Sequence, residues 1–86
     1  MHTDEYEISL SREIDVCRTK VHALKKNLTC MERKFSLTTE AFVARAGHGE
    51  LSPGNKDFID WLDDYRALRM WQATLNQYEE LFLLMR

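Results

Sequence analysis

The sequence has few of the residues that interrupt helices. Its 86 residues include one proline and three glycines, and all four lie between Gly47 and Gly54. Neither charge sign dominates, since 12 basic and 14 acidic residues leave a formal net charge of −2. With 44% apolar and 30% charged residues, the composition is untypical of disordered or all-β proteins and favours an α-rich chain.

Long apolar runs are also missing. The longest, 81–85, has five residues, whereas a helix needs about 20 to cross a bilayer. The first residues are acidic and lack the apolar segment of a secretory signal. We therefore expect a cytoplasmic protein that makes no membrane contact.

Cysteine is limited to Cys17 and Cys30, which form no Cys-x-x-Cys pair. Both fall within one predicted helix, about 20 Å apart at about 1.5 Å per residue. A disulfide between them is excluded, because bridged Cα atoms lie within about 7 Å. The spacing also disfavours a zinc site.

Residues 4–35 carry an unbroken heptad pattern of apolar residues. The alternating three- and four-residue spacing predicts a long helix with one buried stripe. Asp4 lies near the expected N-terminal end and Lys34 near the C-terminal end, as the helix dipole favours. The stripe consists of Leu10, Ile14, Cys17, Val21, Leu24, Leu28, Met31 and Phe35.

A stop and a restart follow this helix. Thr38 is the expected N-cap of a short helix over 39–46, with Leu37 and Phe42 placed to form a hydrophobic staple. Gly47 and Gly49 can supply the left-handed conformation that ends it. Residues 47–54 are the expected loop.

A second long helix is predicted over 55–85, and it is apolar on two sides. The spacing of its aromatic-rich stripe slips at Leu68, which indicates either a change of packing partner or a tighter supercoil there. The stripe comprises Phe58, Trp61, Tyr65, Leu68, Trp71, Leu75, Tyr78, Phe82 and Met85. A second stripe recurs every eleven residues and comprises Ile59, Leu62, Met70, Ala73, Leu81 and Leu84.

The predicted fold is therefore all-α, a single domain over 1–86. Two long antiparallel helices are joined by a short helix and a loop. Because a two-helix hairpin buries only one stripe per helix, we expect the second stripe to meet another chain. Two hairpins would then pair into a homodimeric four-helix bundle.

No pattern indicates catalysis, a cofactor or a metal. The histidines lack ligand spacing, and His48, between two glycines, is the one best placed to reach a partner. Asp57, Asp60 and Asp64 share a helical face and leave open a metal-dependent hydrolase acting across a dimer interface. The basic block 12–34 carries seven basic and three acidic residues; its charges form no single stripe, so nucleic-acid binding is a further alternative that we do not favour.

Part of the chain resembles a known group. The residues concerned are the run 32–42 (ERKFSLTTEAF), Gly49-Glu50-Leu51 and Asp57-Phe58-x-x-Trp61. This pattern is similar to short prokaryotic helical proteins often associated with toxin–antitoxin gene pairs, and the likeness covers about residues 24–86. The chain departs from it with Phe35-Ser36-Leu37, where the pattern has Tyr-Gly-Met. The resemblance implies a helical fold and a small toxin as partner.

We therefore expect a non-catalytic interaction module that neutralises a target by covering it with the second long helix. Trp71 and Tyr78 are open between core and contact, since both residue types are common in interfaces. The predicted partner-binding residues are Ile59, Leu62, Met70, Trp71, Tyr78, Leu81 and Leu84.

Overall fold

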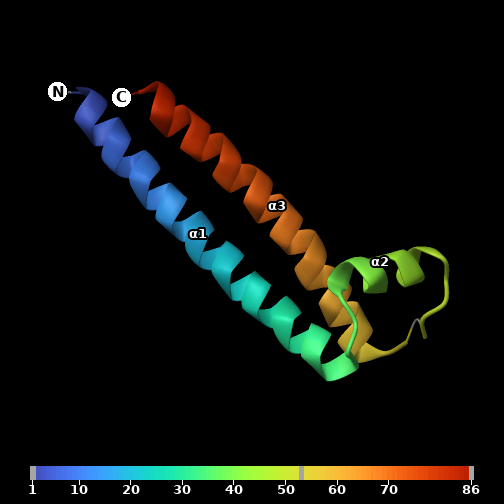
Figure 1. Ribbon diagram of the computed structural model, residues 1–86. Helices are drawn as coiled ribbons and strands as arrows, with labels where there is room; N and C mark the ends of the chain where they lie inside the picture. Colours follow the sequence, from blue (N-terminus) through green and yellow to red (C-terminus); the bar gives the residue numbers. More distant parts are fainter. Residues whose placement is uncertain (1, 53, 86) are drawn as a thin grey trace.

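The computed structural model describes residues 2–52 and 54–85, with side chains from Glu5 onward. It contains three helices, α1 (His2–Phe35), α2 (Thr39–Gly47) and α3 (Lys56–Leu84). The long helices run antiparallel and bring the start of α1 beside the end of α3, while α2 lies at the opposite end (Figure 1). The all-α hairpin with a short connecting helix is confirmed, and the helix bounds lie within two residues of those predicted.

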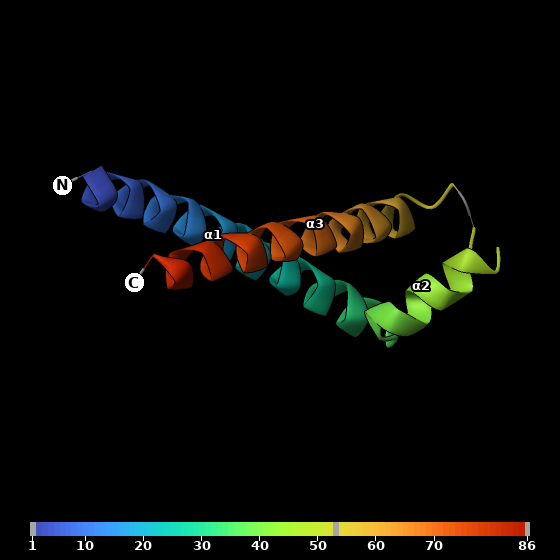
Figure 2. The same ribbon diagram turned by 90° about the horizontal axis from the view of Figure 1, so that it is seen from above.

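The molecule is an elongated rod of 56 × 21 × 19 Å. α1 and α3 cross one another when seen from above (Figure 2). A rod of two helices has little interior, so each long helix keeps a large part of its circumference in contact with solvent.

α1 buries one stripe against α3, as the heptad pattern predicts. Leu24, Met31 and Phe35 are partly buried. The predicted contribution of Asp4 to the helix dipole lies outside the described side chains. The fully buried members are Leu10, Ile14, Cys17, Val21 and Leu28.

α1 ends at a residue in the left-handed region. Ser36 has φ 49°, a conformation that costs most L-residues energy and that glycine adopts readily. The next N–H, from Leu37, donates to the carbonyl of Glu32 at 3.1 Å, which is the bond of a Schellman stop. Serine thus occupies the position where the resembled pattern has glycine.

α2 begins with the predicted cap. Thr38 is extended, and its side-chain oxygen accepts a hydrogen bond from the N–H of Ala41 at 3.1 Å. Leu37 and Phe42 belong to the same apolar cluster, which agrees with the predicted staple. α2 ends at Gly47, and the left-handed conformation that follows its C-cap, His48, is supplied by Gly49, with φ 70°, and not by Gly47.

α3 begins at an asparagine cap. The side-chain oxygen of Asn55 accepts hydrogen bonds from the N–H groups of Asp57 at 2.9 Å and Phe58 at 3.3 Å. These bonds satisfy two of the otherwise unpaired donors at the start of a helix.

Two apolar clusters hold the hairpin together. The aromatic cluster lies beside α2, and the aliphatic cluster lies toward the open end of the hairpin. Leu68, where the spacing of the stripe slips, packs against both. The buried residues of the aromatic cluster are Leu28, Phe42 and Trp61. Those of the aliphatic cluster are Leu10, Ile14, Cys17, Val21 and Leu75.

Trp61 is the centre of the aromatic cluster. Its ring stacks on Phe42 with centroids 3.9 Å apart and an interplanar angle of 2°. The indole N–H donates to the hydroxyl of Thr39 at 3.1 Å, in a buried hydrogen bond. A buried indole is costly without such a partner, so α2 contributes both the stacking ring and the acceptor that Trp61 requires.

Candidate interaction surface

The inner face of α3 is occupied by the rest of the chain. All nine residues of the aromatic-rich stripe belong to, or pack against, one of the two clusters. Trp71 and Tyr78 are among them, partly buried against the aliphatic cluster. Of the two roles that the sequence leaves open for this pair, the structure therefore shows packing against α1.

The outer face of α3 is defined by Ile59, Leu62, Met70, Ala73, Leu81 and Leu84. Four of its large side chains are exposed: Ile59 by 48%, Met70 by 60%, Leu81 by 43% and Leu84 by 79%. Ala73 is also exposed, whereas Leu62 is partly buried against the aromatic cluster. Single exposed apolar residues are common on proteins, but a row along one helix indicates a contact surface.

A groove runs between α2 and the start of the outer face. Its volume is about 360 Å³, and Ile59 and Leu62 are the outer-face residues that line it. Its other lining residues are Phe42, Ala46, Gly49, Leu51, Ser52 and Phe58. With one serine among eight lining residues, the groove is suited to an apolar side chain.

Sequence reasoning missed this groove. The staple and the turn at Gly49 predict where α2 begins and ends, but the spacing of α2 residues gives no indication that Ala46 faces Ile59. That juxtaposition depends on the path of the chain between α2 and α3.

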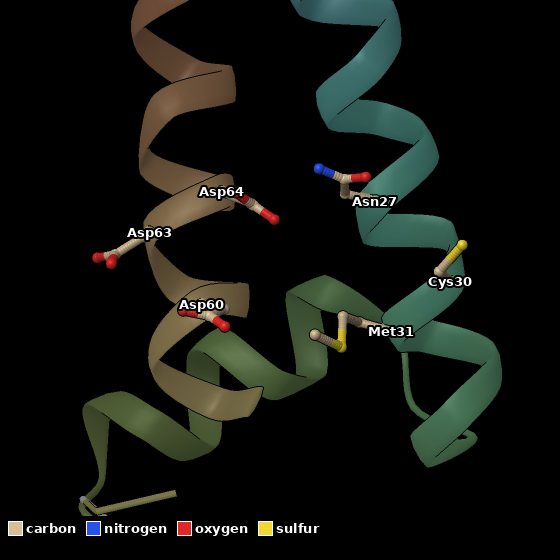
Figure 3. A pocket seen from close by; sticks show the side chains of 6 residues that line it. All are labelled: Asn27, Cys30, Met31, Asp60, Asp63 and Asp64. Atoms are coloured by element: carbon tan, nitrogen blue, oxygen red, sulfur yellow. The ribbon is translucent and has the colours of Figure 1, made fainter. Parts of the chain in front are cut away.

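The acidic residues of α3 lie in different surroundings and have different partners. Asp60, Asp63 and Asp64 line an open hollow with Asn27, Cys30 and Met31, and Asp64 points toward Asn27 (Figure 3). Burial, and then the nearby Asp60, raise the pKa of Asp64, while a hydrogen bond from Asn27 opposes the increase. Among the described residues, no group of three or more His, Cys, Asp or Glu side chains could hold a metal ion.

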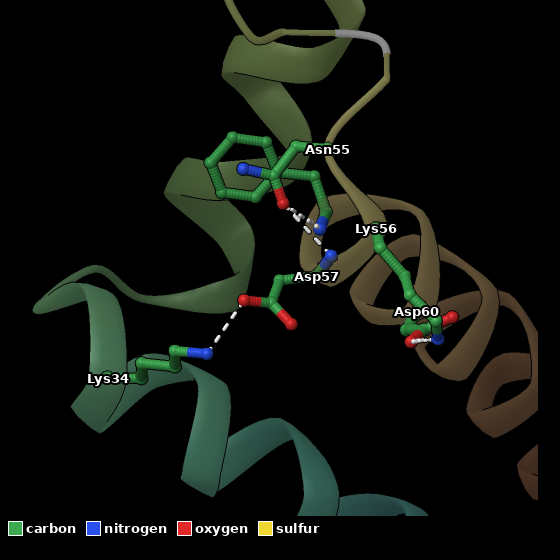
Figure 4. Close-up of polar contacts among 6 residues, drawn as sticks. Lys34, Asn55, Lys56, Asp57 and Asp60 are labelled. Atoms are coloured by element: carbon green, nitrogen blue, oxygen red, sulfur yellow. Dashed lines mark hydrogen bonds and ion pairs between the residues drawn. The ribbon is translucent and has the colours of Figure 1, made fainter.

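Asp57 instead pairs with a lysine of α1. Its carboxylate lies 2.7 Å from the Lys34 ammonium, and Asp60 lies 2.9 Å from Lys56 (Figure 4). The hydrogen bond to Asp60 is the main cause that raises the pKa of Lys56. The three aspartates of the hydrolase alternative thus have different partners, and both ion pairs are exposed enough to contribute little stability.

The basic block of α1 faces solvent and, in two places, α3. Arg18 pairs with Glu79 at 2.8 Å and Lys34 with Asp57. These ion pairs join the basic helix α1 to the acidic helix α3. His22 and His48 are exposed, and His48 is the C-cap of α2.

The cysteines occupy different environments. Cys17 is buried and Cys30 is exposed, and both are free thiols. Burial raises the pKa of Cys17, with a further contribution from Glu13. A buried thiol whose pKa is raised is a weak nucleophile, so Cys17 serves as a packing residue.

Comparison with known proteins adds no relative. No family model, curated protein or solved structure matches the chain. The resemblance to short prokaryotic helical proteins therefore stays a prediction. In the part of the chain that the structure describes, neither long helix combines the length and apolar character needed to span a bilayer.

Proposed function

We propose that the protein is a non-catalytic protein-interaction module that binds through the outer face of α3. The observation that carries this proposal is the row of exposed apolar side chains at Ile59, Met70, Leu81 and Leu84, on a helix whose inner face is already occupied. An amphipathic helix of this kind is recognised by docking against a groove or another helix.

The magnitude of the burial supports contact with a partner. Complete burial of one large apolar side chain contributes roughly 1.5–3 kcal/mol. Covering the exposed half of four such side chains therefore contributes on the order of 3–6 kcal/mol per copy. That is a substantial fraction of the about 5–15 kcal/mol that stabilises a typical domain.

The proposed assembly is a four-helix arrangement of two hairpins. Burial of the outer faces of two copies would contribute about twice the free energy given above for one copy. This gain is of the same order as the roughly 4–15 kcal/mol cost of association. Self-pairing is therefore expected to depend on protein concentration.

The toxin implied by the resemblance is the more specific hypothesis. A toxin that presents an apolar surface would compete with the second copy for the outer face, and its neutralisation would consist of covering that surface. The charged α1 helix would keep the complex in solution. The module would act in the cytoplasm, as expected from the sequence.

The test is a matched pair of substitutions on α3. Leu81→Asp places a charge on the outer face, whereas Leu83→Asp places one at a leucine that is 68% exposed but lies off that face. In sedimentation velocity at micromolar concentration, the wild type and Leu83→Asp should exceed the mass of the 10.2 kDa chain. Leu81→Asp should sediment as a monomer with an unchanged circular dichroism spectrum.

The opposite results are equally clear. A wild type that stays monomeric at every concentration would refute self-pairing, and equal effects of the two substitutions would place the contact elsewhere. A candidate toxin is tested with the same variants by calorimetry, where Leu81→Asp should weaken binding and Leu83→Asp should not.

A further inference from the structure

The groove and the outer-face leucines Leu81 and Leu84 lie at opposite ends of the outer face. Ile59 and Leu62 line the groove, whereas Leu81 and Leu84 lie at the end of α3. From Ile59 to Leu84 the helix is continuous and spans about 38 Å. One chain cannot bring its own Leu84 into its groove, but a second copy can.

The outer face has a repeat that is symmetric about its centre. When the exposed polar residues Arg66 and Gln77 are included, the spacings read three, four, four, three, four, four and three. This series is the same in either direction. The full set is Ile59, Leu62, Arg66, Met70, Ala73, Gln77, Leu81 and Leu84.

We propose that two copies pair antiparallel through this face, with Leu84 of each copy entering the groove of the other. The proposal rests on the proposed function and identifies its partner. Each apolar residue then meets an apolar one, the polar residues meet each other, and the large Met70 meets the small Ala73. The pairs are Ile59 with Leu84, Leu62 with Leu81, Arg66 with Gln77, and Met70 with Ala73.

Charge favours this direction over a parallel one. A parallel pair would place Arg66 against its own copy and bring together the two acidic starts of α3, which carry four aspartates within residues 57–64. The antiparallel pair puts the acidic starts at opposite ends, and antiparallel helix dipoles attract. It also places Arg66 one turn from Glu80 of the second copy, within reach of an ion pair.

The register is also restricted. A shift by one repeat of eleven residues in one direction brings the Arg66 side chains of the two copies opposite each other. A shift in the other direction brings Gln77 opposite itself, shortens the overlap and leaves both grooves empty. Only the centred register uses the whole face, and its two-fold symmetry fills both grooves in the same way.

Site-specific cross-linking tests the register. In a Cys30→Ser background, which removes the exposed thiol, Ile59→Cys and Leu84→Cys proteins are prepared separately and then mixed. A short bis-maleimide can join facing positions on packed helices, whose axes lie about 8–10 Å apart. The mixture should yield a cross-linked dimer joined from 59 to 84, and either protein alone should yield several-fold less. Leu83→Cys in place of Leu84→Cys is the matched control and should cross-link less.

The outcomes separate this inference from the proposed function. Cross-linking of each variant with itself, in a protein that sediments as a dimer, would establish a parallel pair and overturn the register while the interaction surface stands. A dimer without any of these cross-links would overturn the register, and it would overturn the surface as well only if Leu81→Asp left that dimer intact. A monomer that yields no cross-link would refute self-pairing altogether.

The groove itself is tested on α2. Ala46→Phe fills the groove from its wall and should weaken the dimer by about tenfold or more, because Leu84 loses its site. Ala44→Phe, at an exposed position on the same helix, should leave the dimer unchanged. Equal dissociation constants for the two variants, with helicity intact, would show that the groove takes no part.

Discussion

The two ends of the hairpin bury their side chains by different means. At the aromatic end three helices contribute, and Trp61 and Phe42 are 0% and 1% exposed. At the open end α1 and α3 pack only on each other, and Trp71, Tyr78 and Phe82 cover the aliphatic cluster while staying partly exposed. The third helix causes this difference in burial. Two helices contact each other along a line, so the side chains at the edges of that contact stay exposed to solvent.

The third helix also leaves one side of α3 uncovered. Beside α2, Ile59 on the outer face of α3 is still 48% exposed, because Phe42 of α2 packs on Phe58 and Trp61. In the proposed dimer, a second hairpin would cover side chains along the whole length of α3, as α2 covers them at one end.

The largest effect is expected at Trp61. Trp61→Ala removes the ring that stacks on Phe42 and should lower the free energy of unfolding by about 3–5 kcal/mol. Urea unfolding followed by circular dichroism measures the loss, at one fixed protein concentration because association would shift the midpoint. Trp61→Phe keeps a stacking ring, loses the hydrogen bond to Thr39 and part of the buried ring area, and should lower the free energy of unfolding by less. A loss below about 1 kcal/mol for Trp61→Ala would show that the aromatic end is not the more tightly packed one.

A smaller loss is expected at the open end. Leu75→Ala removes the buried α3 residue of the aliphatic cluster and should cost about 2–3 kcal/mol, near the lower limit for leucine, because two helices can close a cavity more easily than three. The same urea experiment gives the value. A loss equal to that of Trp61→Ala would remove the distinction between the two ends.

The stop of α1 should yield a gain. Ser36→Gly relieves a left-handed conformation that costs roughly 1–2 kcal/mol, and it loses about 0.4–1 kcal/mol through the more flexible unfolded chain. The net gain should be about 0.5–1 kcal/mol by urea unfolding. Gly49→Ala is the converse control and should destabilise, since its added Cβ meets open space and only the positive φ opposes it. A neutral or destabilising Ser36→Gly would contradict this account of the stop.

The smallest effect concerns pH. Because the pKa of Asp64 is raised above its ordinary value of 3.8, the folded state binds this proton more tightly than the unfolded state. Stability from this group is therefore gained as the pH falls toward 3.8 and lost as it rises through the raised pKa. Asp64→Asn should be slightly more stable than the wild type at pH 7, and its advantage should vanish near pH 3.8. Thermal unfolding across this pH range measures the stability of both variants, with Asp63→Asn as the exposed control. The same dependence of stability on pH in the two variants would contradict the expectation.

Much of the helical structure could be predicted because its causes are local. The heptad spacing indicates which side of α1 is buried, and the cap at Thr38 with its staple indicates where α2 begins. The slip at Leu68 indicates where α3 changes cluster. Each of these depends on residues within a few turns of one another, whose relative positions a helix fixes.

Other features could not be predicted because they join distant parts of the chain. The hydrogen bond from Trp61 to Thr39 links residues 22 positions apart, and the groove depends on how the chain returns from α2 to α3. Trp71 and Tyr78 were open between two roles, since an interface and a core select the same side chains. In the structure both pack, partly buried, against the aliphatic cluster, and their contribution to an interface stays a prediction.

Local periodicity thus accounts for the helices, their caps and the two apolar sides of α3, because backbone geometry converts spacing into faces. The three-dimensional arrangement accounts for which side is covered, how completely each end is packed, and where a groove opens beside Ile59. The physical reason is that burial depends on neighbours brought close by the fold, and a residue's position in a periodic series does not specify them.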